Sequence, residues 1–140
     1  MSEIKSPSKP LPVVQPWARP YWDAAREHRL VLQCCEDCDR IIHYPRVACP
    51  HCGSARLGWR EASGRGAVYS YTVVESNAPS AFLADMPYVV AVVELAEGVR
   101  ILTNLVDCDQ HALRCDMQVE VVFEKLSEEF VLPKFRPASR

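Results

Sequence analysis

The chain has 140 residues and a net charge of −2, and 49% of its residues are hydrophobic and 24% charged. This composition is that of a globular protein, with either one ordinary domain or a small metal module joined to a compact barrel. The longest apolar run, residues 88–93, is far shorter than the ~20 residues of a membrane-spanning helix, and the first residues lack the apolar core of a signal peptide; we therefore expect a cytoplasmic protein with no membrane partner.

The N-terminal segment is rich in proline. Five of the eleven prolines lie within the first twenty residues. Proline fixes the backbone in an extended form and removes a hydrogen-bond donor, so such a segment has little tendency to fold by itself. We predict a flexible arm over residues 1–16.

A short helix is predicted next, over residues 17–29. Pro20 suits the first helical turn, and the alanines and charged residues that follow favour a helix. Two helical turns are not stable alone, so this helix must pack on something. Trp17, Tyr21 and Trp22 place three aromatic side chains on this short segment, and we expect them to contact a second protein.

Four cysteines in two pairs, Cys35 with Cys38 and Cys49 with Cys52, carry the clearest chemical signal. A C-x2-C pair points two sulfurs from one tight turn, and two such turns form a closed tetrahedral site with Zn–S distances of ~2.3 Å. In a reducing compartment such pairs bind metal rather than form disulfides. We predict a structural zinc site; four thiolates also suit iron, but zinc is the preferred assignment.

The other cysteines are Cys34, Cys108 and Cys115, which we expect to be small, buried or half-buried residues. Cys34 competes with Cys35 for a place in the metal site. The two-residue spacing of the second pair favours Cys35.

Residues 30–63 are predicted to form a zinc ribbon around this site. A strand over 30–33 leads into the first cysteine turn, and an antiparallel return is expected over 41–44. Gly53 follows the second pair and can complete its turn with a positive φ. Asp39 has the equivalent place after the first pair, and Asp tolerates left-handed backbone better than most residues.

Residues 64–140 have the pattern of a small β-barrel. Alternating apolar and polar residues predict half-buried strands. The expected strands cover 67–74, 88–95, 100–106, 118–125 and 130–132, with a loop over 77–86 and one helical turn over 109–114. Five short strands with this spacing indicate a Greek-key barrel of the OB type, so the chain is mostly β. Phe82, in the apolar loop, is predicted to belong to a docking surface for a partner or an acyl chain.

Several segments, taken in order, resemble one known family. They are Tyr21-Trp22-Asp23-Ala24-Ala25, Leu30-Val31-Leu32-Gln33, the two cysteine pairs, residues 64–74 beginning Gly-Arg-Gly-Ala-Val-Tyr, Pro87-Tyr88-Val89-Val90, and Phe135-Arg136-Pro137. Together they resemble the DUF35 family, OB-fold acyl-CoA-associated proteins with a rubredoxin-like zinc ribbon, over roughly residues 17–137. Asp39 stands where the family usually has Gly, and Cys115-Asp116 where it tends to have Gly before Met117.

This resemblance implies a function. Family members are small accessory subunits of thiolase-like enzymes, including thiolases, retro-aldolases of side-chain degradation and acyl-condensing enzymes, and some work beside MaoC-type hydratases. The resemblance therefore predicts a non-catalytic subunit that binds such an enzyme in a hetero-oligomer and supports acyl-CoA metabolism, with lipid or steroid side-chain degradation as the expected pathway class. Coenzyme A thioester is expected within the complex, without an assignment of the residues that touch it.

Two other function classes compete with this interpretation. Zinc ribbons and OB barrels both bind nucleic acids, and seven arginines lie between residues 26 and 65. Residues 66–132, however, carry three Lys/Arg and eleven Asp/Glu, a net charge of −8, whereas phosphate binding needs a basic groove. A free-standing enzyme is the weaker alternative, since a closed metal site is non-catalytic and the sequence shows no acid–base pair or nucleophile motif.

Overall fold

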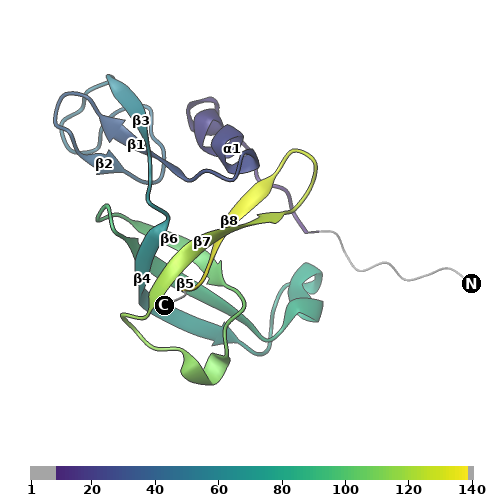
Figure 1. Ribbon diagram of the computed structural model, residues 1–140. Helices are drawn as coiled ribbons and strands as arrows, with labels where there is room; N and C mark the ends of the chain where they lie inside the picture. Colours follow the sequence, from purple (N-terminus) through teal and green to yellow (C-terminus); the bar gives the residue numbers. More distant parts are fainter. Residues whose placement is uncertain (1–8, 139–140) are drawn as a thin grey trace, which may run out of the picture.

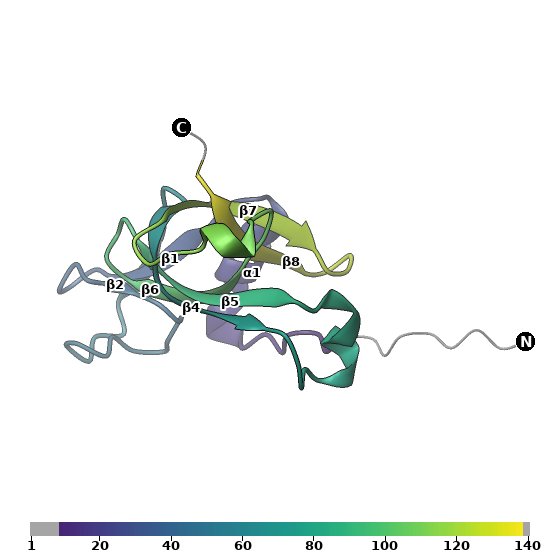
Figure 2. The same cartoon turned by 90° about the horizontal axis from the view of Figure 1, so that it is seen from below.

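The computed structural model describes residues 9–138, which form a short helix, a three-stranded ribbon and a closed five-stranded barrel (Figure 1). The predicted mostly-β fold with an OB-type barrel is confirmed. Helix α1 and the ribbon lie together on one side of the barrel, and both lie behind it in the view of Figure 2. No helix within residues 9–138 is long and apolar enough to cross a membrane.

The N-terminal part contains a 3-10 turn, η1 (Pro16–Ala18), and helix α1 (Arg19–Arg26). Proline in the first turn of α1 removes an N–H that would have no helical partner. The inner face of α1 buries Tyr21, Ala24 and Ala25, and the helix packs on strands of both the ribbon and the barrel. The first eight residues of the predicted arm lie outside the described residues.

The ribbon is a three-stranded antiparallel sheet. Strand β1 (Val31–Cys35) lies in its centre, between β2 (Ile41–Ile42) and β3 (Leu57–Glu61). The return strand is shorter than predicted, and β3 was missing from the prediction. Its sequence, LGWRE, has a glycine and no clear alternation, and its five residues become a strand because each pairs with β1.

The barrel has the strand order β4-β5-β6-β8-β7, and β7 pairs with β4 to close it. Its strands are β4 (Arg65–Val74), β5 (Tyr88–Leu95), β6 (Arg100–Leu105), β7 (Gln118–Lys125) and β8 (Val131–Pro137). Two 3-10 segments, η2 (Ser80–Asp85) and η3 (Gln110–Ala112), lie in the loops after β4 and β6. Strand β8 is longer than the predicted 130–132.

The seam between β6 and β8 is the short side of this barrel. These two strands are parallel and share one register pair, Leu105 with Phe135, whereas β7 and β8 pair antiparallel over the whole of β8. Strand β8 has a full ladder with β7 but only one register pair with β6. A proline, which lacks an N–H to donate, is tolerated in a strand that is unpaired along most of one side, and Pro133 fits there for that reason. The Thr103 hydroxyl donates to the Pro133 carbonyl across the seam, at 3.4 Å.

One hydrophobic core joins the three parts of the molecule. It contains Tyr21 of α1 and Leu30 and Leu32 of the ribbon, together with barrel residues such as Val68, Val93 and Phe135. A second, much smaller cluster of Cys35, Ile42 and Cys49 lies at the far end of the ribbon. The ribbon is therefore packed on the barrel at its base, while its cysteine end has little apolar surface to stabilise it.

Candidate metal centre and docking groove

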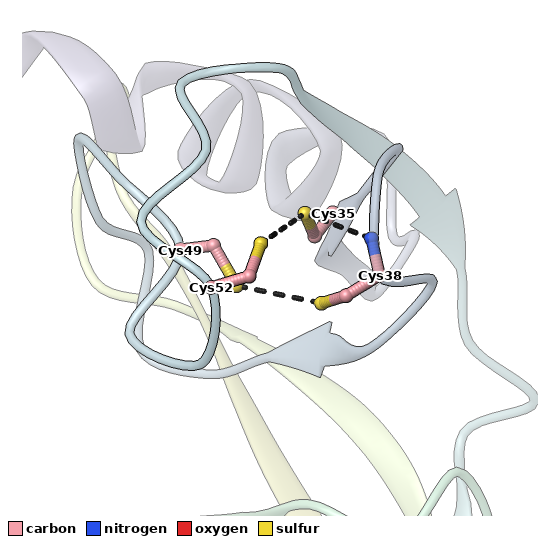
Figure 3. A group of neighbouring side chains, drawn as sticks. All are labelled: Cys35, Cys38, Cys49 and Cys52. Carbon is pink, nitrogen blue, oxygen red and sulfur yellow. Dashed lines mark hydrogen bonds between the residues drawn. The ribbon is translucent and has the colours of Figure 1, made fainter.

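The four predicted ligands come together at the far end of the ribbon (Figure 3). Their sulfur atoms all lie within 4.8 Å of one another, and the Cys35–Cys52 and Cys38–Cys49 sulfurs are each 3.6 Å apart. A tetrahedron with Zn–S of 2.3 Å has edges of about 3.8 Å, whereas a disulfide needs about 2.05 Å. The spacing therefore fits a four-thiolate metal site, with Cys35 at the end of β1, Cys38 in the turn that follows, and the other two in the loop between β2 and β3.

The two cysteine turns have the same backbone geometry. The N–H of Asp39 donates to the Cys35 carbonyl at 2.9 Å, and the N–H of Gly53 donates to the Cys49 carbonyl at 2.8 Å. Both donors have positive φ, 60° for Asp39 and 80° for Gly53. The predicted left-handed positions are thus confirmed, and Asp replaces Gly without changing the turn.

Backbone N–H groups also point at the sulfurs. The N–H of Cys38 donates to the Cys35 sulfur, and that of His51 to the Cys49 sulfur, each at 3.4 Å. The bond from Cys38 is the main reason why the pKa of Cys35 is lowered to about 7. At Cys52 the backbone hydrogen bond from Ser54 favours the thiolate. The hydrogen bond with the Cys35 sulfur and the loss of solvent together outweigh it, and they raise the pKa of Cys52 to about 12. Four sulfurs this close need a cation before all can ionise.

A polar network connects the two cysteine turns at the surface. Asp37, inside the first pair, accepts from the hydroxyl of Ser54 and from Arg56 Nη1, the latter at 2.6 Å. Arg56 also lies 3.6 Å from the Glu36 carboxylate. Because these groups are exposed, each contact adds little stability, but together they fix the second turn against the first.

The remaining cysteines lie outside the site. Cys34 is not in the cluster, because neighbouring strand residues point to opposite faces and Cys35 faces the metal site. Cys34 and Cys108 are half-buried, as expected. Cys115 is exposed, so the prediction that it would be at least half-buried was wrong; it lies in the turn before β7, where Asp116 has a positive φ.

The predicted aromatic docking residues of the helix line one groove, which we call the ribbon-side groove. It has a volume of about 410 Å³ and lies between α1, the ribbon loop and the seam of β6 and β8. Its walls include Trp17, Tyr21, Trp22, Tyr44 and Leu102. Trp17 is 41% exposed and Leu102 61%, whereas Tyr21 is 8% exposed and belongs mainly to the core.

Phe82 lines a second hollow, the barrel-end groove, of about 600 Å³. Phe82 lies there beside Tyr88, with ring centroids 6.3 Å apart, and Lys9 of the arm pairs with Asp85 at 2.7 Å. The two grooves share three wall residues, Asn104, Leu132 and Lys134. They therefore meet along the β6–β8 seam, and the four predicted docking residues all line this joined surface.

Two residues of this surface were not predicted from the sequence. Tyr44, in the ribbon loop, and Leu102, in β6, are both large, exposed and next to the seam. Leu102 is an apolar residue on the outward face of a strand whose neighbours Ile101 and Thr103 are buried. An apolar residue at this outward position is the sign of an exposed apolar surface that the sequence contained at β6.

Comparisons with known proteins agree with this architecture. Residues 22–58 match the model of the ChsH2 rubredoxin-like zinc ribbon domain, and residues 59–124 that of the ChsH2 C-terminal OB-fold domain. This chain belongs to the DUF35 family. A DUF35 domain-containing scaffold protein of Methanothermobacter thermautotrophicus is 39% identical over 97 residues, which cover 68% of this chain and 71% of that protein.

Other similar proteins include one much longer chain and two solved structures. A probable enoyl-CoA hydratase alpha subunit of Thermomonospora curvata is 44% identical over 118 residues, 84% of this chain but 36% of that protein, so the chain spans about a third of it. A solved structure described as Ltp2-ChsH2(DUF35) aldolase superposes with a TM-score of 0.84 and 41% identity, covering 92% of this chain and all of that one. A DUF35 structure from Sulfolobus solfataricus, at 15% identity and a TM-score of 0.62, shares the fold.

Proposed function

We propose that this chain is a non-catalytic scaffold subunit that binds a thiolase-like enzyme, an aldolase in the first instance, and supports its action on an acyl-CoA substrate. The observation that carries the proposal is the apolar groove along the β6–β8 seam, lined by Trp17, Trp22 and Phe82. Trp17 is exposed and Trp22 and Phe82 are half-buried, and aromatic side chains around a hollow are typical of protein interfaces. Tyr21 contributes through its position beneath Trp22, with the two rings 5.4 Å apart.

The descriptions of similar proteins support this proposal, because they name scaffold proteins and subunits of enzymes. One is described as an Ltp2-ChsH2(DUF35) aldolase, several as scaffold proteins, and two as hydratase alpha subunits, one of them for 3-oxo-4,17-pregnadiene-20-carboxyl-CoA. On this basis the pathway is acyl-CoA breakdown of a lipid or steroid side chain. A MaoC-type hydratase is a further candidate partner in the same assembly.

We propose that Cys35, Cys38, Cys49 and Cys52 hold a structural Zn²⁺ ion. The sulfur spacing fits the ion, and the small cysteine-end cluster cannot stabilise the ribbon by itself. Bound zinc neutralises the thiolates and contributes on the order of 10 kcal/mol to folding such modules. Because four protein sulfurs complete the tetrahedron, no position remains for a substrate.

The direct test is co-purification of the tagged chain from cells that naturally make it, with the bound protein identified by mass spectrometry. We expect a thiolase-like enzyme in stoichiometric amount. With both proteins purified, Trp17→Ala and Phe82→Ala should each weaken binding at least tenfold by calorimetry, as expected for residues at the centre of an interface.

Leu83→Ala provides the matched control. Leu83 is exposed and lies next to Phe82 in η2, but it does not line the groove, so binding should stay within about twofold of the unsubstituted chain. A purified chain that stays monomeric, with no such enzyme at any stage, would contradict the proposal.

Nucleic-acid binding has less support. Four of the seven arginines at positions 26–65 are engaged in ion pairs, namely Arg26, Arg29, Arg56 and Arg60, and the barrel segment is acidic. Paired arginines do not form the free basic groove that phosphates require. Salt-dependent retention on single-stranded DNA would favour this alternative instead.

A further inference from the structure

Gln33 connects the first cysteine turn to the loop before the second. It lies in β1, two residues before Cys35, and is 3% exposed. Its side-chain amide donates to the Arg46 carbonyl at 2.9 Å, and its carbonyl accepts from the Arg46 N–H at 2.7 Å. The side chain thus pairs with the loop as a strand backbone would. Both of its buried polar groups are satisfied, and the loss of such bonds in the interior is costly.

Tyr44 connects the same loop to the barrel. Its hydroxyl accepts a hydrogen bond from the Leu102 N–H at 3.0 Å. Leu102 lies in β6, which pairs with β8 at Leu105 and Phe135, three residues further along the strand. Leu102 itself has no register partner in β8. The Tyr44 hydroxyl therefore takes the place of a strand partner for Leu102, and Tyr44 and Pro45 form the ribbon-side wall of the groove.

The loop of residues 43–48 is consequently fixed at three points. It begins after Ile42 of β2, is held midway by Gln33 and Tyr44, and ends at Cys49, a predicted metal ligand. Each neutral hydrogen bond contributes about 1 kcal/mol net. Without the ion the cysteine end has only its small apolar cluster, and these bonds must offset the whole entropy of ordering the loop, at roughly 1–2 kcal/mol per residue.

We propose that Gln33 and Tyr44 are positioning residues that couple the metal centre to the ribbon-side groove. With the ion bound, the loop is ordered and Tyr44 completes the groove wall; with the ion removed, the loop loosens, Tyr44 leaves Leu102 and the groove opens. Metal occupancy would thereby control whether the groove can receive its protein partner, and this last clause rests on the proposed function.

Amide hydrogen exchange of Leu102 measures the coupling directly. Exchange is followed by NMR on the full chain, loaded with Zn²⁺ or treated with a chelator under reducing conditions. We expect metal removal to speed exchange at Leu102 at least tenfold, while the amides of Val93 and Val119 in the barrel core stay protected. Tyr44→Phe, kept loaded with metal, should speed exchange at Leu102 to a similar degree because it lacks the acceptor.

Two further variants complete the test. Gln33→Met keeps the side-chain volume and removes both bonds to Arg46, so the loaded variant should show intermediate exchange at Leu102 and faster Zn²⁺ release to a chelator. Tyr71→Phe is the matched control: the Tyr71 hydroxyl has its hydrogen bond elsewhere, donating to the Leu113 carbonyl at 3.2 Å, so exchange at Leu102 should be unaffected. Equal protection of Leu102 with and without metal, or in Tyr44→Phe, would overturn the coupling.

The result is independent of the partner. Exchange at Leu102 is measured on the chain alone, so a failure to co-purify a thiolase-like enzyme would reject the proposed function and leave the coupling standing. Conversely, unchanged protection at Leu102 would reject the coupling while the docking experiment could still succeed.

Discussion

His43 is a residue whose surroundings do not match its chemistry. Both ring nitrogens are buried, and neither has a hydrogen-bond partner within the described part of the chain. The ring packs between Tyr21 and Tyr44, at centroid distances of 5.6 and 4.2 Å. Burial disfavours the charged imidazolium and lowers the pKa of His43 to about 4. The imidazole is therefore neutral at pH 7, and it packs as an aromatic side chain between Tyr21 of the helix and Tyr44 of the ribbon loop.

A pH dependence follows from this shift. The pKa is lower in the folded state than the ordinary value of 6.5, so the unfolded state binds more protons between these values. Above pH 6.5 His43 is neutral in both states and its full contribution to the free energy of unfolding is present. As the pH falls towards 4 the unfolded state takes up a proton that the folded state does not, and the free energy of unfolding drops by at most about 3 kcal/mol. His43→Phe should remove this loss, seen as a shallower fall in the free energy of unfolding from pH 6.5 to 4.5 in urea titrations.

The control for this comparison is His111→Phe, at an exposed position. Acid also protonates the four clustered cysteines, but that effect is common to all three chains and cancels in the difference. The same pH slope in His43→Phe and in the unsubstituted chain would show that His43 is not buried in solution.

At this scale the sequence was most informative about the metal site. Each C-x2-C pair forms within one turn, so its geometry depends on a few neighbouring residues, and the spacing also separated Cys35 from Cys34. The contact of Tyr44 with Leu102 joins residues that are 58 positions apart, and the Gln33–Arg46 pair depends on the path of a loop. Such contacts have no short-range pattern, and the sequence therefore could not predict them.

Among the elements, strand β4 has an unusually close neighbour. A Cβ atom at Gly66 would lie 2.6 Å from the Glu94 carbonyl oxygen and 2.7 Å from Val93 Cγ1 of β5. The first of these atoms is backbone and cannot move without disturbing the β4–β5 ladder. Gly66 is therefore required for the close approach of the two strands where the chain enters the barrel.

Gly66→Ala should destabilise the barrel by about 3 kcal/mol, as expected for overpacking against backbone. Gly58→Ala, in β3 of the ribbon, is the matched control, because its new methyl group would meet the mobile end of Glu36 at 3.3 Å and should cost less than about 1 kcal/mol. Urea unfolding by circular dichroism gives both values. Equal stability of the two variants would show that β4 can shift away from β5.

Element prediction succeeded where one face of a strand is buried and the alternation is regular. The strands at 88–95 and 118–125 have the predicted limits. Strand β3 was missed because it is formed by pairing with β1 rather than by its own pattern. Strand β8 was predicted too short because Pro133 and Pro137 read as breakers, although pairing with β7 accommodates both.

For the whole molecule, the important feature is the core that ribbon and barrel share. Leu32 lies in ribbon strand β1 and is 1% exposed, yet it belongs to the cluster that contains Val68 and Phe135 of the barrel. The boundaries we propose, with the ribbon at 30–63 and the barrel at 64–140, therefore divide the chain but not its core. The base of the ribbon should therefore unfold together with the barrel, whereas the cysteine end, which has its own small cluster, can loosen separately.

Leu32→Ala should lower the free energy of unfolding of the whole chain by about 2–5 kcal/mol through the cavity it leaves. Amide exchange in β7, at Val119, should speed up with it, although β7 is in the barrel. Leu57→Ala is the control, since Leu57 packs on the small cysteine-end cluster and should affect the ribbon alone. Unchanged protection of Val119 in Leu32→Ala would mean that the two parts unfold independently.

The unequal closure of the barrel has a mechanical consequence. Four of its five seams are antiparallel ladders with three or more register pairs, whereas β6 and β8 are parallel and share a single register pair. Under load, such a cylinder splits at that line first and leaves the other ladders intact. An incoming chain that inserted there would have to break only the Leu105–Phe135 pairing and the few hydrogen bonds beside it, so the barrel could widen on that side while the other ladders stay paired.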